Sequence, residues 1–326
     1  MGIGILDVLI WHMANSYRLD GISAQVIGTI TRSVFTPGFL FLSGFGIYYS
    51  YSSNANKIDF FKRRLGRLLI PFWVMVTVIF LFRLAISGVG DLSYYLGMIT
   101  TASFWLPGRT FNYWYIAVVV AFYIVYPFVH DFVFGKNNCN KRGEIYLKTS
   151  LICVSLVILN IFLREYYPYY YKEIELAIPK LPMLFIGMIA GYLAKEEDAE
   201  INIISWSLLI GSIVIICYIL KRYNTYFDQY YYIIDKLLTI PLVIIIFEYL
   251  TTHKKSIVNR LLPIFTWLGA FTLELYVIHI YLMTVVRDFN QLPSYAEWWI
   301  AVPISFLICI PMKKLTTYIT NLIIRK

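Results

Sequence analysis

Two histidines stand inside stretches that are otherwise almost entirely apolar. His12 lies in LDVLIWHMAN near the N-terminus and His279 lies in LGAFTLELYVIHIYL near the C-terminus, where Glu274 is a further ionisable residue. Ionisable side chains within apolar spans are costly and therefore indicate function. A neutral imidazole can take the proton of a hydroxyl and make its oxygen more nucleophilic. The histidines therefore predict acid–base chemistry, and the alternative is that each ring only anchors its span at the water interface.

Four cations are packed into a short segment, IDFFKRRLGRLLIPFW, which forms the second candidate site. Arg64 and Arg67 are three residues apart and so share one face of a helix. Guanidinium pairs bind phosphate through charge-assisted forks. The segment predicts a phosphate-binding site made of Lys62, Arg63, Arg64 and Arg67. Its alternative role is a topology signal that contacts lipid headgroups.

Two further stretches carry weaker signals. FTPGFLFLSGFGIYYS contains Ser43 among small residues, which let neighbouring backbones approach closely. FNYWYIAVVVAFYIVYP contains Trp114, a residue type common at the membrane interface. Taken alone, each stretch is explained by packing or by interfacial anchoring.

The composition indicates which elements position these residues. The chain has 326 residues, of which 59% are hydrophobic and 14% are charged, whereas soluble domains carry roughly 25% charged residues. Several continuous apolar runs approach the ~20 residues that cross a bilayer as a helix. The predicted fold is an all-α, polytopic integral membrane bundle. About ten spans are expected, at residues 1–16, 33–52, 67–87, 112–134, 146–164, 178–194, 203–221, 232–250, 264–285 and 296–316.

The distribution of lysine and arginine predicts the orientation. Basic residues gather in the loops that are cytoplasmic if the N-terminus lies inside, as the positive-inside rule requires. Ten spans then place both termini in the cytoplasm. Most of the net charge of +9 is thereby explained as a topology signal rather than as a sign of nucleic-acid binding. The short apolar stretch 94–105 is expected to be a re-entrant or interfacial helix, since one more span would invert everything after it.

Other patterns narrow the function further. The four cysteines are scattered and show neither metal-ligand spacing nor a disulfide framework, so no metal site is expected. The predicted outer loops REYYPYYYKEIE and KRYNTYFDQYYYIID are rich in tyrosine. Tyrosine suits stacking on sugar rings, and a belt of aromatic residues at the membrane interface is the alternative.

Taken in order, these stretches resemble the membrane-bound acyltransferase family 3. The family's histidine near the end of its first span corresponds to His12. The family's remaining elements correspond to a Ser-Gly-Phe element at Ser43–Phe45, an Arg-x-x-Arg pair with a following proline at Arg64, Arg67 and Pro71, a tryptophan-led span at Trp114, a GxxxGY element at Gly187–Tyr192, and a late signature at Gly269, Thr272, Tyr276 and His279. Glu274 stands at a position that is often acidic in relatives.

The resemblance covers essentially the whole chain and implies a single membrane-embedded acyltransferase domain over residues 1–326. It implies an O-acetyltransferase of the bacterial inner membrane. Such an enzyme transfers an acetyl or other acyl group from cytosolic acetyl-CoA, its co-substrate, to a sugar hydroxyl of a cell-envelope polysaccharide, an exopolysaccharide or a lipid-linked glycan. The implied partners are membrane lipid and this glycan acceptor. A homo-oligomer and polysaccharide-assembly partners are left open.

The resemblance also suggests roles for the candidate residues. His12 is expected to act as the general base or as a transient acyl carrier, and Glu274 and His279 to orient that base or protonate the leaving thiolate. Lys62, Arg63, Arg64 and Arg67 are expected to bind the phosphates of acetyl-CoA, and Ser43, Trp114 and Tyr276 to contact substrate. One position departs from the family, which has arginine or lysine eleven residues before the first histidine, where this sequence has Met1. Either a short N-terminal segment is missing, which the shortness of the first span favours, or the protein lacks a basic group used at the donor site.

A transporter or flippase for a lipid-linked saccharide is the alternative function. It would also need buried ionisable residues and tyrosine-rich outer loops. It differs in needing no phosphate-binding site for a cytosolic co-substrate.

Overall fold

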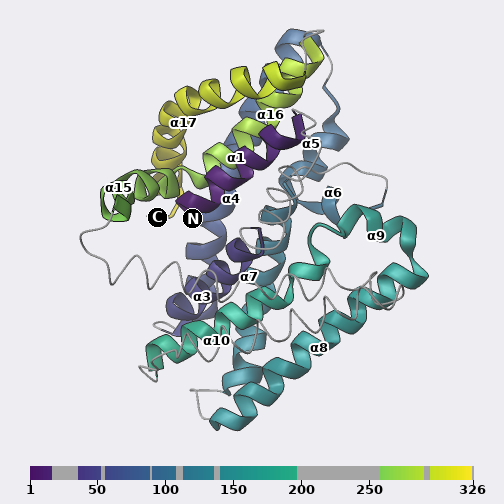
Figure 1. Ribbon diagram of the computed structural model, residues 1–326, viewed down its shortest axis with the longest axis vertical. Helices are drawn as coiled ribbons and strands as arrows, with labels where there is room; N and C mark the ends of the chain where they lie inside the picture. The colour runs from purple at the N-terminus through teal and green to yellow at the C-terminus, as the bar shows by residue number, and fades with distance from the viewer. Residues whose placement is uncertain are drawn as a thin grey trace. The chain divides into compact units, whose positions relative to one another are not determined.

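The computed structural model describes residues 1–16, 36–52, 56–88, 90–107, 113–135, 140–196, 257–289 and 294–324, and every regular element in these ranges is helical (Figure 1). The all-α fold class is therefore confirmed. In these ranges five helices are long and apolar enough to cross a membrane, or six if one bent pair counts as a single span. The predicted spans 203–221 and 232–250 lie outside the described residues, and the count of ten stays a prediction.

The chain divides into two compact units, and each is described by itself. Unit 1 comprises Met1–Ala24, Asn56–Val125 and Ile264–Lys326, and unit 2 comprises Gln25–Ala55 and Tyr126–Pro263. The helix α7 (Trp114–Phe134) is divided between the units after Val125.

Unit 1 is built around three long helices. These are α4 (Lys57–Ser87), α16 (Thr272–Phe289) and α17 (Ser294–Ile324). Helix α16 packs along α17, and α17 also contacts α4 and the short apolar helix α1 (Gly2–Ser16). The indole N–H of Trp298 donates a hydrogen bond of 2.7 Å to the carbonyl of Leu9, which joins α17 to α1. This packing brings the first and the last described segments of the chain together.

Helix α4 begins ten residues before the predicted span 67–87. Asn56 caps its first turn, because the side-chain oxygen accepts hydrogen bonds from the amides of Ile58 and Asp59. The helix ends at Gly88, whose φ of 65° is the left-handed conformation that glycine adopts without strain. The four clustered cations therefore lie on the first turns of a continuous helix rather than in a loop.

The stretch 94–105 forms no spanning helix, as predicted. It folds into α5 (Leu92–Ile99) and the four-residue α6 (Ala102–Trp105). Eight residues of helix rise only ~12 Å, against the ~30 Å of a bilayer core. The indole of Trp73 donates to the carbonyl of Ile99 at 2.7 Å, and the hydroxyls of Thr77 and Tyr95 lie 2.8 Å apart, so α5 is held against α4.

Within the predicted span 264–285 the chain bends by 68° between α15 (Ile257–Ala270) and α16, so two helices stand where one span is expected. The last carbonyls of α15 accept hydrogen bonds from nearby residues. The amide of Phe271 donates to the carbonyl of Leu268, and the hydroxyl of Thr272 donates to that of Gly269 at 2.9 Å. These bonds satisfy a helix end that would otherwise stay unpaired. A new helix then starts at Thr272, which places Glu274 in its first turn.

Unit 2 contains α3 (Thr36–Ser52), α8 (Arg142–Tyr166), α9 (Pro168–Ile174), the single 3-10 turn η3 (Ile178–Lys180) and α10 (Pro182–Glu196). Its tightest contact joins α3 and α10. A Cβ on Gly44 would lie 1.9 Å from the carbonyl oxygen of Leu184, and one on Gly187 would lie 2.0 Å from that of Phe41. Only glycine permits backbones this close, so these two sequence elements pack against each other.

Candidate active site

The rings of His12 and His279 meet inside unit 1. Their centroids are 5.2 Å apart, and the rings are inclined edge to face at 63°. His279, on α16, is fully buried, and His12, on α1, is partly buried. These two candidate acid–base residues are therefore in contact.

The two ring nitrogens of His279 have different surroundings. Nδ1 lies 2.5 Å from the carbonyl oxygen of Leu275, one turn earlier on the same helix. Because a carbonyl can only accept, Nδ1 carries the proton and donates it. Nε2 is buried and has no hydrogen-bond partner among the described residues. The neutral ring therefore presents a lone pair at Nε2 on the inside of the site.

Three tyrosines form an aromatic wall beside this pair. The ring centroid of Tyr276 lies 6.4 Å from that of His279, and Tyr113 and Tyr115 lie 6.0 Å and 6.2 Å from Tyr276. The hydroxyl of Tyr113 donates to the carbonyl of Val277 at 3.3 Å, and the amide of Tyr115 donates to the hydroxyl of Tyr276. These bonds attach the start of α7 to α16.

Trp114 lies at the edge of this wall. Its ring packs edge to face against Tyr115 with centroids 6.2 Å apart, and Tyr115 in turn packs on Tyr276. The predicted substrate residues Trp114 and Tyr276 are thus brought near His279, with Tyr115 between them. Sequence reasoning singled out Trp114 and missed the two tyrosines beside it, although their position at the start of an apolar helix was a usable signal.

Glu274 does not lie against either histidine. It is fully buried, and its carboxylate accepts from the ammonium of Lys313 at 3.2 Å and from the hydroxyl of Thr316 at 3.3 Å. Five residues separate Glu274 from His279, which turns the side chains to different faces of α16 by about 140°. The structure joins Glu274 to α17 instead, a contact that sequence reasoning missed because Lys313 was read only as a topology signal.

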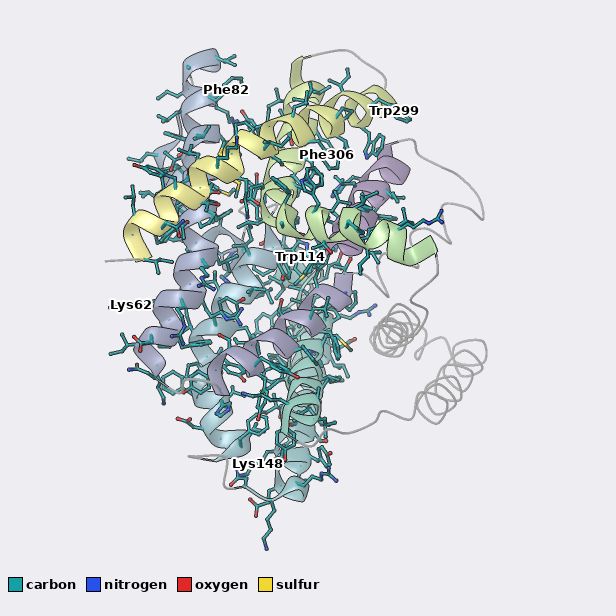
Figure 2. All side chains as sticks on the ribbon, turned by 90° about the vertical axis from the view of Figure 1, so that its left-hand side faces the viewer. Lys62, Phe82, Trp114, Lys148, Trp299 and Phe306 are labelled. Carbon is teal, nitrogen blue, oxygen red and sulfur yellow. The ribbon has the colours of Figure 1, made fainter. Side chains whose placement is uncertain are left out.

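The four clustered cations differ in exposure. Lys62 and Arg67 are exposed, whereas Arg63 and Arg64 are partly buried. The guanidinium of Arg64 hydrogen-bonds to the hydroxyl of Tyr123 on α7. Figure 2 shows Lys62 and Phe82 towards opposite ends of α4. These cations belong to the same unit as the histidine pair.

Helix α4 joins the cation cluster to the aromatic wall. Phe72 contacts Tyr113 of the aromatic wall with ring centroids 5.7 Å apart. Arg64 precedes Phe72 by eight residues, which corresponds to ~12 Å of helix. An extended molecule bound at Arg64 with its anionic end is thus compatible with a reactive end near the wall.

Ser43 belongs to unit 2, and its environment is that of a packing residue. It is buried, and its hydroxyl donates to the carbonyl of Phe39 on its own helix at 2.8 Å. The neighbouring Gly44 forms the close contact with α10. The geometry places Ser43 in the helix interface between α3 and α10.

Unit 2 contains a buried histidine that sequence reasoning missed. The ring of His130, on α7, is surrounded by those of Tyr51, Phe134, Tyr126 and Tyr48 at centroid distances of 4.7, 4.9, 5.9 and 6.0 Å. Neither ring nitrogen has a hydrogen-bond partner in the described ranges, and Asp131 is 4.0 Å from Nδ1. The sequence signal was FVHDF, an ionisable pair inside an apolar run.

Comparison with known proteins identifies the family. The family model described as an acyltransferase domain, of the acyltransferase-3 type, matches residues 2–313. The chain belongs to the acyltransferase-3 family and is a membrane acyltransferase, consistent with its apolar helices. No curated protein and no solved structure matches the chain.

Proposed function

We propose that this membrane acyltransferase is an O-acetyltransferase that moves an acetyl group from acetyl-CoA to a sugar hydroxyl of a cell-envelope glycan or exopolysaccharide. The contact between the rings of His12 and His279 is the observation that supports this most. Transfer to a hydroxyl needs a group that takes its proton, and a buried pair of imidazoles with a free lone pair is suited to that task.

The reaction exchanges one acyl bond for another. The sugar hydroxyl gives its proton to an imidazole, and its oxygen attacks the thioester carbonyl. The carbon–sulfur bond then breaks, and the thiolate of CoA takes the proton. In one form an imidazole of this pair is the base, and in a second form His12 carries the acyl group between donor and acceptor. The second form would give ping-pong kinetics.

The cations on the first turns of α4 are proposed to bind the donor. Arg64 and Arg67, with Lys62 and Arg63, would hold the phosphates of acetyl-CoA through charge-assisted hydrogen bonds. The partial burial of Arg64 against Tyr123 supports this, because it restricts the guanidinium before a ligand arrives. The arm of the donor would then follow α4 towards Phe72 and the aromatic wall.

The aromatic wall is proposed to bind the acceptor. Tyr276 and Trp114 offer ring faces on which a sugar can pack, and tyrosine also offers a hydroxyl. Ser43 lies in unit 2, and its predicted contact with substrate is not part of this proposal. Glu274 is likewise proposed to act through the position of α16 rather than by touching the base.

The proposed location is the bacterial inner membrane, with the donor site and both termini on the cytoplasmic side. The cations of α4 and the positive-inside rule support this orientation. The aromatic wall would then bind an acceptor glycan that is attached to lipid or is leaving its assembly machinery. A lipid-linked-saccharide transporter is the alternative, and it would release no CoA from acetyl-CoA.

A deletion experiment tests the proposed function. Proton NMR of surface polysaccharide should show acetyl signals in cells with the gene and a loss of those signals in cells without it. Complementation with His12→Ala should leave the signals absent while the protein remains in the membrane, and complementation with His130→Phe should restore them. Unchanged acetyl content in the deletion strain, or full restoration by His12→Ala, would reject the proposal.

A further inference from the structure

We infer that His279, rather than His12, is the residue that takes the proton from the acceptor hydroxyl, and that it does so through Nε2. This inference rests on the proposed function, which it deepens by dividing the work between the two rings. From the family resemblance, His279 is expected only to orient the base or to protonate the leaving thiolate.

The first observation is the fixed tautomer of His279. Its Nδ1 donates to the carbonyl of Leu275 at 2.5 Å, a partner that belongs to the same helix and cannot accept a proton permanently. When one ring nitrogen of a histidine donates a hydrogen bond, the other nitrogen is left with the lone pair that can accept a proton. Nε2 is therefore held as the acceptor, and the ring cannot turn without losing this bond.

The second observation is the surroundings of Nε2. His279 is fully buried, and no hydrogen-bond donor from the described residues reaches Nε2. Buried polar atoms normally have a partner. The ring of His12 is in contact yet does not supply one, since it meets His279 edge to face with centroids 5.2 Å apart. A ligand that completes this site must therefore bring a donor, and a hydroxyl group is such a donor.

The third observation is the support behind His279. The carbonyl of Val277 accepts from Tyr113, and Glu274 on the same helix is tied to Lys313 and Thr316 on α17. Helix α16 is thus fixed on two sides of the histidine. His12 lies on the short helix α1, where its ring is partly exposed. The more strongly positioned ring is the better base, because a general base must hold its geometry in the transition state.

The proton transfer balances as follows. The sugar O–H bond breaks as its proton moves to Nε2, which makes His279 an imidazolium with Nδ1 still bound to Leu275. The sugar oxygen forms a bond to the acyl carbon, and the carbon–sulfur bond breaks. The proton on Nε2 then passes to the thiolate, which leaves as the free thiol. His279 returns to its starting tautomer, and His12 remains beside it for contact with the acyl group.

Nitrogen NMR tests the tautomer independently of any activity. The full chain with ¹⁵N-labelled histidine rings is studied in lipid nanodiscs at neutral pH, and His279→Gln identifies the signals of His279. We expect a protonated Nδ1 and an unprotonated Nε2. The His130 ring, which has no carbonyl partner among the described residues, gives the comparison signal. An Nε2–H tautomer or a doubly protonated ring would overturn the inference.

Chemical rescue tests the role. Membrane vesicles carrying His279→Ala are given acetyl-CoA labelled in the acetyl group, and incorporation into the glycan of the vesicles is counted. The variant should lose ~10²–10⁴-fold of the rate. Added imidazoles should restore part of it, with a rate that rises with the pKa of the added base. Rescue that does not depend on the pKa of the added base would show that His279 is not the base. Rescue of His12→Ala that rises with that pKa would assign the proton transfer to His12.

The two failures can be told apart. If wild-type vesicles release no CoA and incorporate no label, the proposed function fails whatever the tautomer is. Thermal unfolding in detergent first shows that His279→Ala and His279→Gln are folded. If wild type is active and both variants keep its rate, the proposed function stands and the role of His279 is refuted.

Discussion

The two fully enclosed histidines of the described chain, His279 in unit 1 and His130 in unit 2, have opposite surroundings. His279 has one nitrogen fixed by a carbonyl and the other next to a second imidazole. Four aromatic rings lie around that of His130, and neither of its nitrogens has a hydrogen bond among the described residues, since 4.0 Å to Asp131 is too long for one.

This difference shows that burial alone does not indicate a site for chemistry. A ring whose tautomer is fixed has a defined acceptor that a substrate can use. A ring in an aromatic shell has no defined acceptor and contributes mainly its surface. We therefore treat His130 as a packing residue and as the control for the histidine pair.

The largest expected effect is on acyl transfer. His12→Ala and His279→Ala should each lower the rate by ~10²–10⁴-fold. If the rings act as a unit, the double variant should be little worse than either single variant, because residues that share one task are not additive. The measurement is initial rate with labelled acetyl-CoA. Losses that multiply in the double variant would mean that the rings act independently.

The next effect is on stability, through the ion pair of unit 1. Lys313→Met leaves the carboxylate of Glu274, which is fully buried, without its charged partner. We expect a cost of about 3 kcal/mol, the lower end of the range for breaking a buried pair because the Lys313 side chain is 38% exposed. Chemical unfolding in detergent measures it.

A matched double variant separates the ion pair from direct catalysis. Glu274→Gln with Lys313→Met removes both charges and should recover most of the stability and the transfer rate. A double variant that is stable but inactive would show that Glu274 takes part in the reaction itself.

The cations of α4 should affect the donor rather than the rate at saturation. Loss of a hydrogen bond to a charged group costs ~1.5–3 kcal/mol, so Arg67→Ala should raise the KM for acetyl-CoA by roughly 10- to 100-fold with kcat nearly unchanged. Arg83→Ala, at the other end of the same helix, is the control. A change in membrane orientation with unchanged KM would favour the topology role.

Unit 2 offers a matched pair of glycines on α3. Gly44→Ala places a methyl group 1.9 Å from the Leu184 carbonyl and should destabilise the unit by ~1–3 kcal/mol, as overpacking does. Nothing lies within 4 Å of the same position on Gly46, so Gly46→Ala should be neutral or stabilise the helix by up to ~1 kcal/mol. Equal effects on thermal unfolding would contradict the described α3–α10 contact.

The smallest effect is expected at His130. His130→Phe keeps a ring of similar shape among the surrounding aromatic rings and removes two polar atoms that have no described partner. Replacing such a group by an apolar one of the same shape can be nearly neutral or stabilising. The thermal midpoint and the transfer rate should both stay close to wild type. A strong loss of transfer would show that His130 has a functional role and would refute its assignment as a packing residue.

The sequence predicted the parts of this architecture that depend on local pattern. Continuous apolar runs predicted the helices α4, α7, α8, α10 and α17, and the shortness of 94–105 predicted that it would not span. His12 and His279 were recognised as candidate site residues because each is ionisable inside an apolar stretch. Each of these inferences needs only the residues along one segment.

The parts that escaped prediction depend on side-chain hydrogen bonds and ring contacts, which the pattern of apolar residues does not contain. At the bend between α15 and α16 the hydroxyl of Thr272 bonds back to Gly269, a contact that apolar periodicity does not report. The pairing of Glu274 with Lys313 joins residues 39 positions apart. The aromatic shell of His130 similarly draws its rings from α3 and α7, so nothing near FVHDF distinguishes it from a catalytic histidine.

The most direct measurement is incorporation of labelled acetyl from acetyl-CoA into membrane glycan by vesicles that carry wild type, His279→Ala or His130→Phe at equal protein content. We expect label in the glycan with wild type and with His130→Phe, and background with His279→Ala. Equal labelling by wild type and His279→Ala would contradict acyl transfer through the paired histidines.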